Sequence, residues 1–198
     1  MRSVRIVLWV LVAIAAAVFA YLMFRPVPQA QPQGEAMNLA SIGGPFTLTG
    51  SDGKPFTSSA LSGKPYGIFF GFTHCPDVCP TTLARMVKLR NKLGAGARPF
   101  EIVFVTVDPE RDGPAEVGKY AELFNSSVIG LTGTPAQISQ VKKQFGIYSR
   151  KVPDQSGSYS VDHTATVLLF DRNGRFTGTI APEESDTAAL AKLKRITS

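Results

Sequence analysis

The chain opens on a long apolar segment. Residues Ile6 to Phe24 contain no charged side chain over 19 positions, which is long enough to cross the hydrocarbon core of a bilayer as a helix. Two arginines precede the segment and one follows it directly, so the positive-inside rule places the start of the chain in the cytoplasm. We therefore expect residues 1–25 to be a single-pass anchor in the inner (cytoplasmic) membrane, with the folded part on the periplasmic side.

A cleaved signal peptide is the alternative interpretation of this segment. Val18 and Ala20 offer a small-residue cleavage site, but the apolar run is longer than the usual core of about 7–15 residues. We favour an uncleaved anchor. Residues 26–38 then lack apolar periodicity and are rich in proline and glutamine, which predicts a flexible tether. Residues 39–198 are enough for one domain with a sizeable core.

The hydrophobic pattern of this domain alternates between strands and helices. Continuous apolar runs predict strands that are covered on both faces, and 3.6-residue spacing predicts amphipathic helices. The expected strands are 65–72, 100–108, 127–131, 147–152, 158–163, 164–171 and 175–181, after an opening hairpin at 45–59; the expected helices are 78–93, 113–125, 135–145 and 185–196. Thr134 and Pro135 are typical of a helix start. The alternation predicts an α/β sandwich with a mostly parallel centre and an antiparallel edge.

Net charge adds little to this picture. After residue 25 the chain has 18 Lys and Arg against 15 Asp and Glu. The basic residues of the helix expected at 78–93 alternate with apolar ones, as on a solvated helix face. The sequence contains no nucleic-acid recognition motif, and we expect no nucleic-acid partner.

The candidate chemistry lies in the only two cysteines, Cys75 and Cys79, which follow the strand expected at 65–72. Residues four apart on a helix have Cβ atoms about 5–6 Å apart, whereas a relaxed disulfide needs about 3.5–4.5 Å. The pair can therefore bind a soft metal more readily than it can form a disulfide. A disulfide can still form if the turn distorts. A strand's carboxyl end is a common place for reactive groups, and a helix amino terminus lowers a thiol pKa because its dipole stabilises the anion, so we expect both features to favour thiolate here.

Three motifs then identify a family. The segments GFTHCPDVCPTTL, VTVDPERD and VDHTATVLLFD, in this order behind a single anchor, closely resemble the Sco/SenC proteins over roughly residues 42 to 195. The resemblance implies a thioredoxin-like fold, with a central mixed sheet flanked by helices, that binds copper and helps to assemble the CuA centre of cytochrome c oxidase. By motif match, Cys75 and Cys79 are two copper ligands and His163 is the third. Ala165 stands where thioredoxins have a cis-proline.

The chemistry of such a ligand set is consistent with copper. Two sulfurs favour Cu(I) and an added imidazole helps to hold Cu(II), so a Cys2His set can accept one copper ion per chain in either state. Zinc in a closed structural site usually takes four protein ligands. His74 is a poor fourth ligand, because adjacent residues of an extended segment point to opposite sides.

Acidic residues near these motifs are weaker candidates for a role at the copper site. Asp108, Glu110 and Asp112 end the strand expected at 100–108, where turn formation and capping are the default explanation. The resemblance suggests a role for Asp108 and Asp112 near the copper site or in partner docking. Asp162 is a candidate for orienting the His163 ring, although a solvent-facing loop aspartate is the simpler interpretation.

Two functions are compatible with these residues. The first, which the resemblance implies, is a membrane-anchored copper chaperone, loaded by another copper chaperone, that delivers copper to the oxidase subunit carrying CuA or reduces that subunit's thiols. The alternative is a thioredoxin-like thiol-disulfide oxidoreductase or peroxidase that uses a redox-active Cys75–Cys79 disulfide. A purely structural disulfide is a weaker option, because so small a loop constrains little of the unfolded chain. The anchor and tether favour a monomer that works at the membrane face.

Overall fold

The computed structural model describes residues 2–24, 42–94, 99–125, 127–154 and 157–198. The chain divides into two compact units, Met1–Ala36 and Met37–Ser198. The first contains helix α1 (Arg2–Phe24), which covers the apolar segment. Among the residues that the structure describes, none of the helices combines the length and the hydropathy that a membrane crossing requires. The tether predicted at 26–38, and the boundary predicted at residue 39, lie outside the described residues.

The second unit is built on a seven-stranded sheet in the order β2-β1-β5-β4-β3-β8-β9. Its strands are β1 (Thr47–Gly50), β2 (Pro55–Thr57), β3 (Tyr66–Gly71), β4 (Glu101–Thr106), β5 (Val128–Thr132), β8 (Val167–Phe170) and β9 (Phe176–Ile180). β3, β4 and β5 run parallel to one another, and the other strands pair antiparallel. The mixed sheet is as predicted, except that both edges, and not one, are antiparallel.

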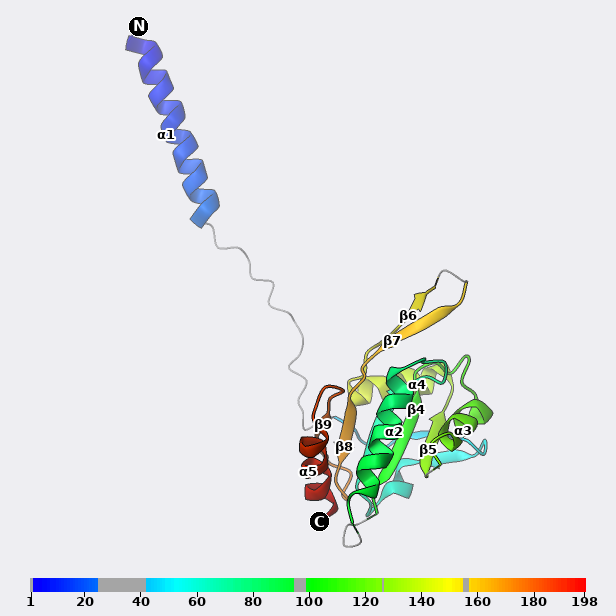
Figure 1. Ribbon diagram of the computed structural model, residues 1–198. Coiled ribbons are helices and arrows are strands. Elements are labelled where there is room, and N and C mark those ends of the chain that lie inside the picture. The colour runs from blue at the N-terminus through cyan, green and yellow to red at the C-terminus, as the bar shows by residue number, and fades with distance from the viewer. Residues whose placement is uncertain (1, 25–41, 95–98, 126, 155–156) are drawn as a thin grey trace. The chain divides into compact units, whose positions relative to one another are not determined.

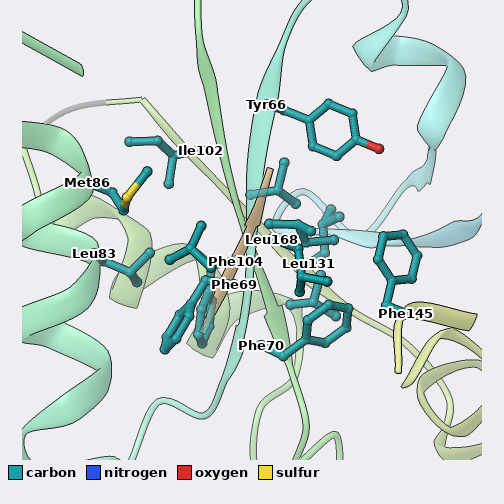
Figure 2. Close-up of a cluster of buried hydrophobic side chains, with 14 of the residues drawn as sticks. Tyr66, Phe69, Phe70, Leu83, Met86, Ile102, Phe104, Leu131, Phe145 and Leu168 are labelled. Atoms are coloured by element: carbon teal, nitrogen blue, oxygen red, sulfur yellow. The ribbon is translucent and has the colours of Figure 1, made fainter. Parts of the chain in front are cut away.

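Helices pack on both sides of this sheet. They are α2 (Val78–Asn91), α3 (Pro114–Glu122), α4 (Pro135–Phe145) and α5 (Asp186–Thr197), with a short 3-10 helix, η2 (Ser58–Leu61). Figure 2 shows Leu83 and Met86 of α2 on one side of β3 and Phe145 of α4 on the other. All six residues of β3 are buried, as its continuous apolar run predicts for a strand covered on both faces. Phe70 reaches α4, with its ring centroid 5.6 Å from that of Phe145.

Local sequence signals fix the start of α4. Thr134 and Gln137 form a capping box, in which the Thr134 side chain accepts from the backbone N–H of Gln137 and the Gln137 side chain accepts from that of Thr134. Pro135 stands in the first turn, where its missing N–H costs nothing. The helix ends at Gly146, which adopts the left-handed conformation with φ 67°. The predicted start is confirmed, and the capping box adds to it.

A second, two-stranded sheet carries the last predicted motif. It consists of β6 (Ser149–Pro153) and β7 (Tyr159–His163), which pair antiparallel with each other. We call this hairpin the ribbon. It extends away from the seven-stranded sheet (Figure 1). Its two strands are among those that the sequence predicts, but the prediction does not separate them from the main sheet.

Candidate metal centre

The two cysteines lie where β3 passes into α2. Gly71 ends β3, and a tight turn follows in which the Cys75 N–H donates to the carbonyl oxygen of Phe72 at 3.2 Å. Cys79 falls in the first turn of α2 and is fully buried, whereas Cys75 is partly exposed. Both are free thiols. The carboxyl end of a central strand therefore places one sulfur inside the domain and the other at its surface.

The start of α2 uses a sulfur where a polar cap would be expected. Asp77 stands at the N-cap position, but its carboxylate makes no capping hydrogen bond and instead accepts from the Thr81 hydroxyl at 3.2 Å. The backbone N–H of Cys79 points at the Cys75 sulfur, 3.4 Å away. The partial positive charge of the helix start is therefore directed at this sulfur.

Burial changes the expectation for the second thiol. Desolvation raises the pKa of Cys79 well above its ordinary value, and a backbone hydrogen bond from Phe72 opposes this only in part. The expectation that the strand end and the helix terminus favour thiolate is therefore wrong for Cys79, because the burial of its sulfur outweighs them. A bound metal ion would have to displace this proton.

His163, the last residue of β7, completes the group from the ribbon. Its Nε2 atom lies 3.4 Å from the Cys79 sulfur, and its Nδ1 atom lies 3.1 Å from the carbonyl oxygen of Thr164. A proton on Nδ1 can be donated to that carbonyl, and the Nε2 lone pair is then free to face the sulfurs. The imidazole packs edge-on against the rings of Phe69 and Phe72, with centroid separations of 6.0 and 5.8 Å.

The ligand atoms of Cys75, Cys79 and His163 all lie within 4.8 Å of one another. Metal bonds of about 2.0–2.3 Å to nitrogen and sulfur place donor atoms about 3.5–4 Å apart around one ion, so the three residues fit a metal. Over the described part of the chain, this is the one cluster of three or more Cys, His, Asp or Glu with such geometry. His74 is outside it, as predicted: its exposed ring has Nδ1 3.6 Å from an Asp112 oxygen.

Asp112 is fully buried beside this group, and it fixes the turn that leads to Cys75. Its carboxylate accepts the backbone N–H of Thr73 at 2.9 Å and the hydroxyls of Thr73 and Thr106, both at 2.6 Å. These hydrogen bonds join the end of β3 to the end of β4. Asp112 therefore acts on the backbone that presents Cys75. Its two threonine partners could not be predicted from the sequence pattern.

Asp108 is also buried and takes part in a second cluster. Its carboxylate accepts from Nε of Arg111 and, at 2.9 Å, from the hydroxyl of Tyr159. Sequence reasoning missed Arg111 and Tyr159 altogether. Glu110, from the same acidic motif, is exposed and forms an ion pair with Lys151 at 2.6 Å.

Asp162 lies on the solvent side of the ribbon. Its carboxylate is 3.2 Å from the guanidinium of Arg150, the residue opposite it in the β6–β7 register. The Nδ1 atom of His163 faces the Thr164 carbonyl oxygen. The backbone, and not the Asp162 side chain, is therefore the partner that orients the ring.

Comparisons with known proteins agree with this geometry. The family model described as SCO1/SenC matches residues 34–198. The mitochondrial SCO2 homologue of Bos taurus is 37% identical over 151 residues, which cover 74% of this chain and 57% of the relative. The mitochondrial SCO1 homologue 1 of Arabidopsis thaliana is 38% identical over 148 residues, covering 73% and 43%. The chain thus spans about half the length of these curated relatives.

Solved structures extend the likeness to the fold. Bradyrhizobium japonicum ScoI with copper bound has a TM-score of 0.71 and 44% identity, covering 78% of this chain and 99% of that one. Arabidopsis thaliana ScoI with copper bound has a TM-score of 0.74 and 34% identity, covering 78% and 96%. BsSco, described as a member of the Sco family of cytochrome c oxidase assembly proteins with a disulfide switch, has a TM-score of 0.63 and 25% identity, covering 80% and 95%.

Proposed function

The chain belongs to the SCO1/SenC family, and we propose that it binds one copper ion through Cys75, Cys79 and His163. In this proposal the copper-bound chain takes part in cytochrome c oxidase assembly. The observation that carries the proposal is the convergence of two sulfurs and one imidazole nitrogen within 4.8 Å. Sulfur donors favour Cu(I), and the added nitrogen supports Cu(II), so the same three residues can hold copper in either state. The copper-bound relatives support the choice of metal.

Copper in this proposal is a cargo. The chain accepts it from another copper chaperone and transfers it to the oxidase subunit that carries the CuA site. Because Cys75 is partly exposed and Cys79 is buried, an incoming thiol of the acceptor reaches the ion from the Cys75 side. Ligand exchange then starts at Cys75, and Cys79 and His163 release the ion last.

A titration of the reduced full-length chain with Cu(II) tests the proposal. We expect binding of one equivalent, with cysteine-to-Cu(II) charge-transfer absorption that is lost in His163→Ala. The matched control is His74→Ala, because His74 is the only other histidine in the sequence and its exposed ring lies outside the metal group. Unchanged Cu(II) binding by His163→Ala would contradict the proposed ligand set.

Thiol chemistry is the second candidate function, and it uses the same sulfurs. In this reaction Cys75 and Cys79 give two electrons and two protons to a disulfide of the partner, which becomes two thiols, and the pair becomes a disulfide. The disulfide switch described for BsSco supports it. Steady turnover with a disulfide substrate, by a chain whose His163→Ala variant is equally active, would favour an oxidoreductase over a copper chaperone.

We also propose that the chain is a monomer anchored by residues 1–25 in the inner membrane, with its domain in the periplasm. This part rests on the sequence alone, namely the charge-free apolar segment and the arginines around it. Full-length protein should stay with membranes through alkaline carbonate washing, and protease added to spheroplasts should digest its domain. Release of the intact chain by the wash would contradict the anchor.

A further inference from the structure

The ribbon presents His163 but has little support of its own. β6 and β7 make their main backbone contacts with each other, and the hairpin extends away from the seven-stranded sheet (Figure 1). A two-stranded hairpin is marginally stable by itself in water. The position of His163 must therefore depend on contacts that hold the ribbon to the rest of the domain.

Alternate residues of β7 form the docking face of the ribbon. Tyr159 and His163 are half-buried and Val161 is buried, while Ser160 and Asp162 between them are exposed. This follows from the two-residue period of a strand, which places every second side chain on one face. His163 stands at one end of that face, against the cysteines, and Tyr159 stands at the other.

Arg111 holds the Tyr159 end of this face. Its Nη1 donates to the backbone carbonyl oxygen of Tyr159 at 2.9 Å, and its guanidinium carbon lies 3.7 Å from the centroid of the Tyr159 ring. Nε of Arg111 donates to the Asp108 carboxylate, which also accepts the Tyr159 hydroxyl at 2.9 Å. The three residues thus form a closed ring of contacts between the end of β4 and the start of β7. We call them the clamp.

The clamp also touches the surroundings of the imidazole. The Arg111 guanidinium lies 5.8 Å from the centroid of the Phe72 ring. Phe72 in turn meets the His163 ring edge-on, with centroids 5.8 Å apart and an interplanar angle of 89°. Phe72 is buried, and its ring therefore links the guanidinium to the imidazole through packed contacts.

We propose that Arg111, with Asp108 and Tyr159, is a positioning residue that docks the ribbon and thereby sets His163 against the two sulfurs. The inference rests on the proposed copper function and goes beyond it, because it separates the two oxidation states. Cu(I) is held mainly by the sulfurs, which the clamp does not touch, whereas Cu(II) depends on the imidazole. Loss of the clamp should therefore weaken Cu(II) binding and leave Cu(I) binding nearly unchanged.

The test variant must remove the clamp without leaving a buried charge. Replacing Arg111 alone would strand the Asp108 carboxylate, which is destabilising. The double variant Arg111→Met with Asp108→Asn removes both charges together. The single variant Tyr159→Leu removes the ring and the hydroxyl from the ribbon side, and it decides the question if the double variant fails to fold. The matched control is Arg150→Ala, which breaks an exposed ion pair on the opposite face of the same ribbon.

Copper affinity is the first measurement, on the full-length chain. We expect the clamp variants to bind Cu(II) roughly tenfold or more weakly, the usual effect of removing a residue that orients a metal ligand, with a shifted charge-transfer band. Cu(I) affinity, measured by competition with a chelator, should change less than about threefold, and Arg150→Ala should match the wild type in both. Equal losses for both ions, or no loss of Cu(II) affinity, would overturn the proposal.

Hydrogen exchange of the metal-free chain is the second measurement. The amides of Tyr159–His163 should exchange faster in the clamp variants, while those of β3 should keep their protection. Faster exchange in β3 as well would indicate a general loss of stability and overturn the positioning role. Failure of the wild type to bind Cu(II) would instead contradict the copper function, and the exchange pattern would still report on the docking of the ribbon.

Discussion

The two sides of the candidate metal centre are supported in different ways. The cysteines follow β3, a fully buried strand that pairs with β4 on one side and with β8 on the other. The histidine ends β7, a strand with one buried residue, whose only strand partner in the described chain is β6. The sulfurs are therefore placed by the core of the domain, and the imidazole is placed by a few polar contacts at its edge.

The difference in support suggests how the proposed copper site can hold both Cu(I) and Cu(II). The close-packed core gives the sulfurs one position, because packed interiors resist small displacements. The ribbon can move at lower cost, because it has few buried contacts. Because Cu(II) depends on the imidazole more than Cu(I) does, a histidine on the less rigid element can serve both states. Variants on the two sides should accordingly differ in their effects on stability.

The largest effect is expected for Asp112→Ala, on the cysteine side. The substitution leaves three donors without their acceptor, namely the Thr73 amide and the hydroxyls of Thr73 and Thr106. Hydrogen bonds to a charged group contribute about 1.5–3 kcal/mol each, and the two Thr73 groups are only partly buried, so the free energy of unfolding should fall by about 3 kcal/mol or more. Urea unfolding of the reduced, metal-free chain measures it. A loss below about 1 kcal/mol would show that the turn before Cys75 does not depend on this carboxylate.

The cysteine side was largely predictable from the sequence. The apolar run of β3 has a single explanation, a strand covered on both faces, and the residues that follow it had to lie at the carboxyl end of the sheet. The burial of Cys79 was harder to predict, because it depends on what packs over the first turn of α2. The charge at a helix end can be predicted from local sequence, whereas desolvation depends on the whole fold. The sequence therefore predicted a lowered pKa for Cys79, and the structure shows a raised one.

The histidine side was predictable only through its motif. The alternation of Tyr159, Val161 and His163 indicates a strand with one buried face, but it does not say what that face contacts. The partner of Tyr159 is Arg111, 48 residues earlier in the chain. No local pattern encodes such a pair, because its formation depends on the angle at which the ribbon leaves the domain. For the same reason, the sequence could not show that the Thr164 carbonyl oxygen, and not Asp162, is the hydrogen-bond partner of the His163 ring.

A smaller effect on stability, with a sharper effect on copper, is expected for Gly71→Ala. A methyl group there would come within 2.7 Å of the Cys79 sulfur, which must then shift from its place in the metal group. Overpacking of this kind costs about 1–3 kcal/mol. Affinity for both Cu(I) and Cu(II) should fall, in contrast to the clamp variants, because a sulfur is displaced.

Gly67→Ala is the matched control for this variant. It lies in the same strand, and its added methyl group would approach Phe100 and Val167 at 3.0 and 3.2 Å, away from the cysteines. It should lower the free energy of unfolding with little change in copper affinity. Equal copper affinities for the two glycine variants would show that the Cys79 sulfur can shift without loss of binding.

The two sides can be compared directly by one substitution made in each. Val103→Ala in β4 and Val161→Ala in β7 remove the same two methyl groups from buried positions with 0% and 5% exposure. We expect a loss of about 2 kcal/mol at Val103, where the core cannot collapse around the cavity, and about 1 kcal/mol at Val161, where the ribbon can adjust. Only Val161→Ala should lower the affinity for Cu(II) more than that for Cu(I). Equal losses of unfolding free energy would mean that the ribbon is as firmly packed as the sheet.

The smallest effect is expected for Asp162→Asn, next to the histidine itself. The ion pair with Arg150 is exposed on both partners, so its loss should change the free energy of unfolding by about 0.5 kcal/mol or less. Because the Nδ1 atom of His163 faces the Thr164 carbonyl oxygen, the charge-transfer spectrum and the affinity for Cu(II) should also stay at the wild-type level. Thermal unfolding and a Cu(II) titration provide the two measurements. A clear fall in Cu(II) affinity would give Asp162 the orienting role that the sequence first suggested, and the position of the ring would then depend on a side chain as well as on the backbone.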